Sequence, residues 1–254
     1  MNHAELTTRL RAAGCVFAEE EADRLLAAAP DAGALESMAA RRVAGAPLEH
    51  VLGFADFAGV RVAVTDGVFV PRHRTELLTA TARTMLRDGG TVLDLCCGTG
   101  ALGLVVAQGR PGVRLVATDL DPAAVACARR NLSGVTAEVF AGDLFSVVPH
   151  DLRGRVDLLL ANVPYVPTAE IAYLPEEFRV HEARTALDGG ADGLDVLRRV
   201  AAEAAAWLAP GGALLTEAGP AQLPAAHALL RTGGLQPRTV TDEETETHVV
   251  VAGR

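Results

Sequence analysis

The sequence predicts an α/β protein in which a seven-stranded, mostly parallel sheet follows a small helical domain. Two observations predict this fold. From Thr91 onward, short apolar runs alternate with helical stretches, an order typical of a parallel sheet with crossover helices. The last two runs, at 235–240 and 247–253, are separated only by the acidic turn 241–246. That turn is too short for a parallel crossover, so the last two strands should pair antiparallel.

The part of the chain before Thr91 predicts two smaller units. Residues 1–55 should form a helical domain, because apolar side chains recur there at helical spacing between charged ones. They are Leu6, Leu10, Val16, Leu25, Leu26, Leu35 and Met38. Residues 56–73 hold two β-prone runs, FAGVRVAV and VFVPR, around Thr65-Asp66-Gly67, and predict a bridging β-hairpin. The large domain should then cover 74–254 and start with a helix from about Arg74 to Arg87.

The remaining strands of the large domain are expected at five apolar runs. These are TVLDLC at 91–96, RLVATD at 114–119, TAEVFA at 136–141, VDLLLAN at 156–162 and GALLTEA at 212–218. With 254 residues, of which 50% are hydrophobic and 22% charged, the chain is long enough to bury a sizeable core in one large domain with a smaller one.

Composition excludes several classes of protein. No apolar run reaches the roughly 18 residues of a membrane span, and the first residues lack the apolar core of a signal peptide. The net charge of -9 disfavours non-specific binding to a nucleic-acid backbone. All 23 basic residues are arginine, which excludes chemistry that needs a Walker or Schiff-base lysine.

The four cysteines predict neither a metal site nor a disulfide framework. Cys15, Cys96, Cys97 and Cys127 have no paired C-x-x-C spacing and no nearby histidine pair. We therefore expect no metal and a reduced, cytoplasmic compartment.

A glycine loop after the first strand of the sheet predicts a nucleotide-like cofactor. Gly98, Gly100 and Gly103 spell G-x-G-x-x-G between a strand and an apolar helix, where the backbone can approach a ligand closely. Asp119 ends the next strand about 20 residues later, where a carboxylate can accept hydrogen bonds from ribose hydroxyls. Both NAD and S-adenosylmethionine carry such a ribose.

Charge separates these two cofactors. Asp94 precedes the loop, where it would repel the pyrophosphate of NAD but would suit the ammonium and sulfonium groups of S-adenosylmethionine. Asp143, after the third strand, can accept a hydrogen bond from an adenine amino group. Acidic side chains at three successive strand ends therefore favour S-adenosylmethionine. The alternative, an NAD-dependent oxidoreductase, is supported only by the G-x-G-x-x-G motif.

The fourth strand ends in Asn162-Val163-Pro164-Tyr165, which resembles the N-P-P-Y signature of methyltransferases that act on planar amide or amino nitrogens. Such nitrogens are poor nucleophiles because their lone pair is delocalised. The Asn162 side-chain oxygen and the Val163 carbonyl can accept hydrogen bonds from both N–H groups, and Tyr165 can stack on the planar group. Val163 replaces the usual first proline, while Pro164 still favours an extended conformation at Val163.

Most of the chain resembles the HemK/PrmC-type protein-glutamine methyltransferases. Pro71 to Glu76 resembles their P-R-P-x-T-E segment with His73 for proline, and DLCCGTG resembles their D-L-G-T-G-S-G loop with Cys96 for glycine. The segment 181–194 resembles E-P-x-x-A-L-x-G-G-x-D-G-L with Ala183 for proline. The helical domain and bridging hairpin also belong to the family plan.

The resemblance implies a class I S-adenosylmethionine-dependent methyltransferase fold, which is Rossmann-like, and a set of site residues. It implies that the cofactor is bound by Asp94, Cys96, Cys97, Gly98, Thr99, Gly100, Asp119, Leu120, Asp143, Leu144 and Asn162. It implies a catalytic segment at Asn162, Val163, Pro164 and Tyr165. It implies a substrate entrance bordered by Arg72, Thr75, Glu76 and Glu182, with Asn162 and Tyr165 also binding substrate.

The resemblance further implies a protein substrate in translation. The family's best-known substrate is the G-G-Q loop of peptide chain release factors, and a sister group acts on a ribosomal protein. We expect in-line methyl transfer without a dedicated general base. The sequence is also compatible with a nucleic-acid (adenine amino) methyltransferase and with a non-enzymatic protein that binds cofactor without transferring methyl.

Overall fold

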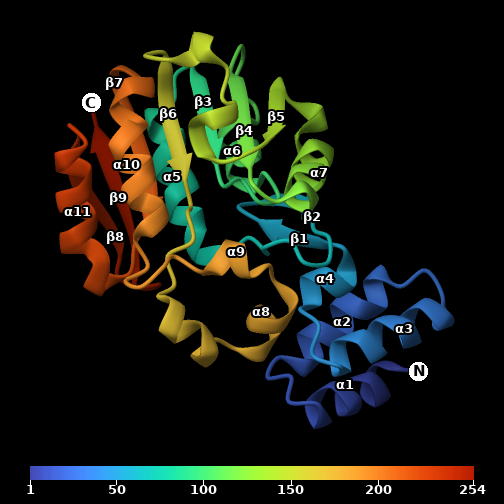
Figure 1. Cartoon of the computed structure of the whole chain (residues 1–254). Coiled ribbons are helices and arrows are strands. Elements are labelled where there is room, and N and C mark those ends of the chain that lie inside the picture. Colours follow the sequence, from blue (N-terminus) through green and yellow to red (C-terminus); the bar gives the residue numbers. More distant parts are fainter.

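The computed structural model describes residues 1–254, and its N-terminal part is a cluster of four helices (Figure 1). They are α1 His3–Ala12, α2 Ala18–Ala28, α3 Ala32–Val43 and α4 Leu48–Leu52. Asn2 and Asp31 cap α1 and α3 by accepting backbone N–H groups of the first turn. The helices close over their own apolar core, which contains Leu6, Leu10 and Leu25. Val16 differs from expectation: it lies in the turn after α1 and is 84% exposed.

The β-hairpin lies earlier in the chain than the sequence predicted. Strands β1 Phe54–Phe57 and β2 Val60–Ala63 pair antiparallel around a two-residue turn, Ala58-Gly59. Both turn residues have positive φ, 48° and 76°, the backbone conformation that matches the twist of a tight hairpin. The predicted turn at Thr65 to Gly67 instead leads into an extended segment, in which Gly67 bridges to Glu182 far along the chain.

The large sheet has the predicted seven strands. Its strands are β3 Thr91–Leu95, β4 Arg114–Asp119, β5 Ala137–Ala141, β6 Val156–Ala161, β7 Leu208–Glu217, β8 Gln236–Asp242 and β9 Thr247–Gly253. Their spatial order is β5-β4-β3-β6-β7-β9-β8. The first five strands are parallel, and β9 pairs antiparallel with both β7 and β8. This topology confirms the predicted fold class.

Helices cover both faces of the sheet. The longer helices are α5 Glu76–Met85, α6 Ala101–Ala107, α7 Pro122–Asn131, α10 Asp195–Trp207 and α11 Leu223–Thr232. One apolar core joins α5, α6 and α7 to the sheet, and a second joins α10 and α11 to the other face. The central strands read as continuous apolar runs because both of their faces are buried.

The order of the strands reverses beside β3, and this position determines where a ligand can enter. From β3 the chain proceeds outward to β4 and β5 on one side. It then returns to the other side of β3 with β6 and continues to β7. In open parallel sheets such a reversal leaves a crevice at the carboxyl ends of the strands. Two short helices, α8 Glu176–His181 and α9 Arg184–Leu187, lie across this end of the sheet (Figure 1). None of the helices is both long and apolar enough to cross a lipid bilayer.

Candidate active site

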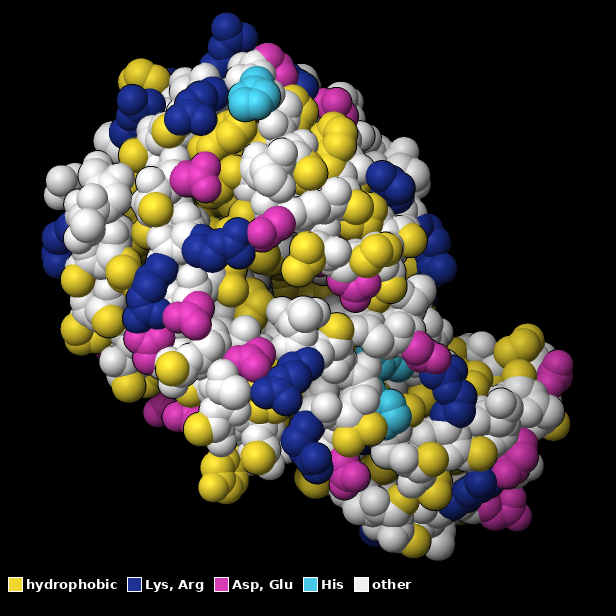
Figure 2. All heavy atoms as spheres, in the orientation of Figure 1, with side chains coloured by type: hydrophobic (Ala, Val, Ile, Leu, Met, Phe, Trp, Pro, Cys, Tyr) yellow, Lys and Arg dark blue, Asp and Glu magenta, His cyan; other side chains and the backbone are white.

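A cavity of about 540 Å³ lies at the carboxyl ends of β3, β4 and β6. The segment 67–75 and the helices α8 and α9 form its opposite wall. The space-filling view shows the molecule hollowed at this place, with apolar side chains in the hollow and charged side chains around it (Figure 2). This volume lies in the range of small-molecule and cofactor sites.

The glycine loop is held in shape by Asp94. Its side chain is only 1% exposed, and one of its oxygens accepts a hydrogen bond from the Gly103 backbone N–H at 2.9 Å. Burial raises the pKa of this carboxyl to about 7, and the charge of Asp119 contributes in the same direction. Asp94 thus lines the cavity and also ties the loop to the start of α6.

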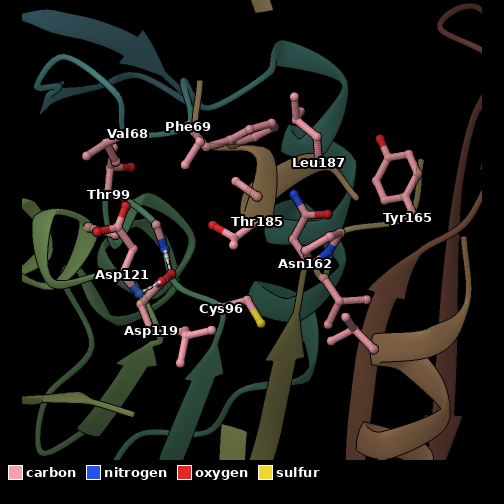
Figure 3. A pocket seen from close by; sticks show the side chains of 18 of the residues that line it. Val68, Phe69, Cys96, Thr99, Asp119, Asp121, Asn162, Tyr165, Thr185 and Leu187 are labelled. Atoms are coloured by element: carbon pink, nitrogen blue, oxygen red, sulfur yellow. Dashed lines mark hydrogen bonds between the residues drawn. The ribbon is translucent and has the colours of Figure 1, made fainter. Parts of the chain in front are cut away.

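Cys96 adopts a backbone conformation that glycine usually takes. Its φ is 54°, in the left-handed region, where a side chain costs about 1 kcal/mol. Glycine adopts this conformation without that cost, and glycine is the residue that the resembled family's motif has at this position. The Cys96 side chain points into the cavity (Figure 3).

Asp119 is oriented by two backbone hydrogen bonds. Its two oxygens accept from the N–H groups of Gly98 at 2.8 Å and Asp121 at 2.9 Å (Figure 3). Each carboxylate oxygen can accept a further bond, so two acceptors remain for a diol such as a ribose. Leu120, the next residue, lines the cavity and is 61% exposed. This corner fits the sugar of a nucleoside cofactor.

Asp143 and Leu144 border the cavity from the loop after β5. The carboxylate of Asp143 forms an ion pair with Arg199 of α10, at 2.6 Å. Arg199 therefore competes for the oxygen that would accept from an adenine amino group. Leu144 is buried and gives an apolar surface at this place.

Asn162 presents an unpartnered polar atom to the cavity. It follows the last residue of β6 and rises into the cavity on the side of Thr185 and Leu187 (Figure 3). Its Oδ1 is buried and accepts no hydrogen bond. Leaving a buried acceptor without a donor costs free energy. Such an acceptor is expected where the N–H group of a bound ligand supplies the missing hydrogen bond.

Two glycines pack closely against the backbone of the loop that follows Asn162. A Cβ atom at Gly189 would lie 2.7 Å from the carbonyl oxygen of Pro164, and one at Gly193 would lie 2.2 Å from that of Tyr165. The Gln222 side chain donates a hydrogen bond to the Tyr165 carbonyl at 2.9 Å. Close packing of the 189–193 segment against this loop explains the glycines of the motif at 181–194.

The four predicted entrance residues have different surroundings. Arg72 lines the cavity, stacked between the rings of Phe69 and Phe178, and forms an ion pair with Glu182 at 2.6 Å. The Glu182 side chain is fully buried and outside the lining, so this pair holds the junction of α8 and α9 against the 67–75 segment within one wall of the cavity. Burial raises the pKa of Glu182, although Arg72 acts against this shift.

Thr75 lines the cavity with a buried hydroxyl that lacks a partner. Glu76 is outside the lining: it accepts from the Ala58 N–H at 3.1 Å and contacts His73, so it joins the β-hairpin to α5. Cys97 and Gly100 also lie outside the lining, whereas Thr99 belongs to it.

Comparison with known proteins identifies the family. The model of the methyltransferase small domain matches residues 60–192, over half of the chain. The chain is 39% identical over 249 residues to the release factor glutamine methyltransferase of Cereibacter sphaeroides, covering 89% of this chain and 87% of the relative. The chain belongs to the release factor glutamine methyltransferase family. The resemblance seen in the motifs is thereby confirmed.

Other similar proteins align with different shares of this chain and of their own length. The release factor glutamine methyltransferase of Mycolicibacterium smegmatis is 43% identical over 188 residues, which span 72% of this chain but 66% of that relative. A 4-amino-L-phenylalanine/4-methylamino-L-phenylalanine methyltransferase of Streptomyces pristinaespiralis is 37% identical over 239 residues, 91% of this chain and 81% of the relative. A Thermus thermophilus 16S rRNA N2 G1207 methyltransferase, solved with AdoMet and guanosine, shares the fold with a TM-score of 0.57 at 23% identity, covering 79% of this chain and 49% of that one.

The matched family model and the relatives are those of methyltransferases, which favours S-adenosylmethionine over NAD as the cofactor. The residues present fit this cofactor. Asp119 has free acceptors for a ribose, and Asp94 adds a second acidic side chain to the lining of the cavity. No group of three or more His, Cys, Asp or Glu side chains is arranged to hold a metal.

Sequence reasoning missed several residues of this site. Phe69, Phe178 and Leu187 line the cavity opposite the sheet. Gln222 holds the Tyr165 carbonyl, and Glu217 ends β7 next to the site. Glu217 carried a usable signal: a carboxylate that ends an otherwise apolar strand is unusual, because a buried charge needs a partner.

Proposed function

We propose that the chain methylates the side-chain amide nitrogen of a glutamine in a peptide chain release factor. The observation that carries this proposal is the unpartnered, buried Oδ1 of Asn162 beside the cofactor loop. A primary amide offers two N–H donors to this corner. Asn162 Oδ1 would accept one of them and the Val163 carbonyl the other.

The cofactor would be held by the chain's own backbone and acidic residues. The glycine loop would approach it through Cys96, Gly98 and Thr99, Asp119 would bind the ribose hydroxyls, and Leu120 and Leu144 would give apolar contacts for the base. S-adenosylmethionine supplies an electrophilic methyl group on a positively charged sulfur. Asp143 reaches the adenine only if its ion pair with Arg199 leaves an oxygen free.

The contribution of the protein would be orientation and electrostatics. Two fixed acceptors hold the amide plane, so its nitrogen is directed at the methyl carbon instead of rotating freely. Acceptors for both N–H groups also stabilise the positive charge that develops on the nitrogen during transfer. The methylated amide nitrogen is strongly acidic, so its extra proton leaves to water and no dedicated base is needed.

The helical cluster would recognise the protein substrate. We propose that the chain has three parts: the helical substrate-recognition domain 1–55, the bridging hairpin 56–73 and the methyltransferase domain 74–254. Arg42 of α3 supports a fixed placement of the first part, because its guanidinium binds Glu21 at 2.6 Å and Glu177 of α8 at 3.4 Å. The helical cluster and one wall of the cavity are thus joined. Such a placement suits a helical cluster that docks a release factor beside the site, and we propose that the reaction takes place in the cytoplasm.

The test is methylation of purified release factor with labelled S-adenosylmethionine. The expected product is a single methylated glutamine in the Gly-Gly-Gln loop, located by mass spectrometry of the digest. A release factor with that glutamine replaced by glutamate is the matched control and should take up no label. Label in both proteins, or in neither while cofactor binding is intact, would contradict the proposal.

A second candidate is methylation of a small aromatic amine. It is supported by the similarity to the 4-amino-L-phenylalanine/4-methylamino-L-phenylalanine methyltransferase over 91% of this chain. The aromatic side chains Phe69 and Phe178, which line the cavity, also favour it. An aryl amine presents two N–H donors like an amide. Turnover of 4-amino-phenylalanine at a rate above that of the release factor would establish this second candidate.

A further inference from the structure

Three arginines line the cavity, and Arg74 is the one that takes part in no ion pair. Arg72 is paired with Glu182 at 2.6 Å, and Arg199 is paired with Asp143 at the same distance. Arg74 has only a neutral partner, a tyrosine hydroxyl. Its charge is therefore available to an anionic group of a ligand.

Arg74 is held in place but keeps most of its hydrogen-bond donors. Its Nη2 donates to the Tyr165 hydroxyl oxygen at 2.5 Å, and its guanidinium carbon lies 5.8 Å from the centre of the Tyr165 ring. Arginine has five N–H donors in a planar fork that matches the two oxygens of a carboxylate. Because the bond to Tyr165 uses one of these donors, the guanidinium can still bind a carboxylate.

The unpaired charges of the lining differ between the two walls of the cavity. Asp94 and Asp119 lie at the carboxyl ends of β3 and β4, and neither forms an ion pair with an arginine. Arg74 belongs to the opposite wall. Figure 3 shows its partner Tyr165 on the side of Asn162, away from Asp119. An anionic substituent of a substrate is therefore favoured on the side of Arg74 and disfavoured beside the cofactor loop.

A buried carboxylate, Glu217, offers a different reason for the presence of Arg74. Glu217 ends β7, and the parallel register of β6 and β7, with Leu160 opposite Leu215, places it alongside Asn162. Burial raises the pKa of Glu217, and the charge of Arg74 acts against this rise. Glu217 is outside the lining and forms no ion pair, so the guanidinium stays open to a ligand. If Arg74 served only this carboxylate, its loss would change stability and not the choice of ligand.

We propose that Arg74 binds a carboxylate of the methyl-accepting substrate, on the wall opposite the cofactor loop. The carboxylate could come from a free amino acid or from an acidic side chain next to the methylated residue of a protein. The P-R-P-x-T-E motif leaves the position of Arg74 open, so this cation is a feature of the chain and not of the motif. The inference rests on the proposed function only in placing the methyl acceptor on this side of the cavity.

The test compares two pairs of probes by calorimetry on protein loaded with S-adenosylhomocysteine, so that binding is measured without transfer. One pair is 4-amino-L-phenylalanine and its carboxamide. The other is the peptides Gly-Gly-Gln-Glu and Gly-Gly-Gln-Gln with blocked termini, which differ in one side-chain carboxylate. We expect the charged member of one pair to bind about tenfold more tightly than the neutral member. The pair that shows this preference identifies the source of the carboxylate.

The variant Arg74→Gln assigns the preference to Arg74. It removes the charge and keeps a polar side chain, so the preference should fall below about twofold. Both members of a pair are measured on the same variant, so a general disturbance of Tyr165 cancels in their ratio. Arg87→Gln is the matched control, because Arg87 follows the far end of α5, is exposed and lies outside the lining. It should leave the tenfold preference unchanged.

Three outcomes overturn the inference. They are equal binding of the charged and neutral members in both pairs, no binding of any probe, and a preference that persists in Arg74→Gln. If this variant keeps the preference and is less stable in denaturant unfolding, Arg74 serves the buried charge of Glu217 instead.

The binding ratios are independent of the labelling test of the proposed function. A wild-type protein that leaves the release factor unlabelled rejects the proposed substrate, and the ratios still decide whether Arg74 takes a carboxylate. Label in the release factor together with equal binding in both pairs upholds the proposed function and rejects this inference.

Discussion

Gly193 packs against the proposed catalytic segment, Asn162 to Tyr165, and replacing it by alanine tests how that segment is supported. Its φ is 75°, and a Cβ atom there would meet the Tyr165 carbonyl oxygen at 2.2 Å and Gln222 Nε2 at 2.3 Å. The new methyl group would occupy the space between the donor and the acceptor of the Gln222 hydrogen bond. Because the carbonyl belongs to the backbone, the Asn162 to Tyr165 segment has to move.

The expected loss of stability has three parts. The left-handed conformation costs alanine about 1 kcal/mol, the broken Gln222 hydrogen bond about 1 kcal/mol, and the steric displacement about 1 kcal/mol or more. We therefore expect Gly193→Ala to lower the free energy of unfolding by about 3 kcal/mol. Turnover should fall about a hundredfold, because the acceptors shift relative to the amide. Cofactor binding should change much less, since the cofactor loop is elsewhere.

Gly234 provides a matched control. Its φ is 83°, and a Cβ atom there would meet nothing within 4 Å. Gly234→Ala should therefore cost only the backbone strain, about 1 kcal/mol, with unchanged turnover. The assay is denaturant unfolding of both variants together with methyl transfer. If Gly193→Ala is no more destabilising than Gly234→Ala and keeps its turnover, the proposed support of the catalytic segment is wrong.

Three further predictions follow from the site and its surroundings. Asn162→Ala should lower turnover at least a hundredfold while calorimetry finds cofactor binding retained; near-normal turnover would reject Asn162 as the amide acceptor. Asp94 has its folded pKa raised to about 7, above that of the unfolded chain, so the stability it contributes is present at low pH and is lost as pH rises from about 4 to 7. The free energy of unfolding of Asp94→Asn, measured at several pH values in this range, should depend less on pH than that of the wild type. An equal pH dependence in both proteins would contradict the raised pKa. Arg42→Ala should cost about 3 kcal/mol by leaving the buried Glu21 without its cation. Arg9→Ala, which breaks an exposed pair, should cost less than about 1 kcal/mol in the same measurement, and similar losses for both would show that burial of the Arg42 pair is unimportant.

Features encoded by neighbouring residues could be predicted from the sequence. Continuous apolar runs, such as the one at 91–96 that contains Leu93, predicted the buried strands, because both faces of a central strand are covered. The short acidic turn after Val240 predicted the antiparallel end of the sheet. The acceptor role of Asn162 stays a prediction, drawn from a motif that fixes residue types at close spacing.

The hairpin shows where such local signals are insufficient. Asp66-Gly67 is a strong turn signal, yet the two-residue turn forms at Ala58-Gly59. Residues after Gly67 are instead held by a distant partner, since the Val70 N–H donates to Glu182. A local pattern ranks possible turns, and contacts with remote segments select among them.

By itself the sequence determined the fold class, the edge of the sheet that carries the site and the chemistry offered by Asp119 and Asn162, since each depends on local periodicity or a short motif. Only the tertiary structure decided that Arg72 of the 67–75 segment pairs with Glu182 between α8 and α9, and that Glu217 lies beside Asn162. Those contacts join residues far apart in the chain. They depend on which strands become neighbours, in which register, and on how the long connections fold back, and no local pattern records these choices.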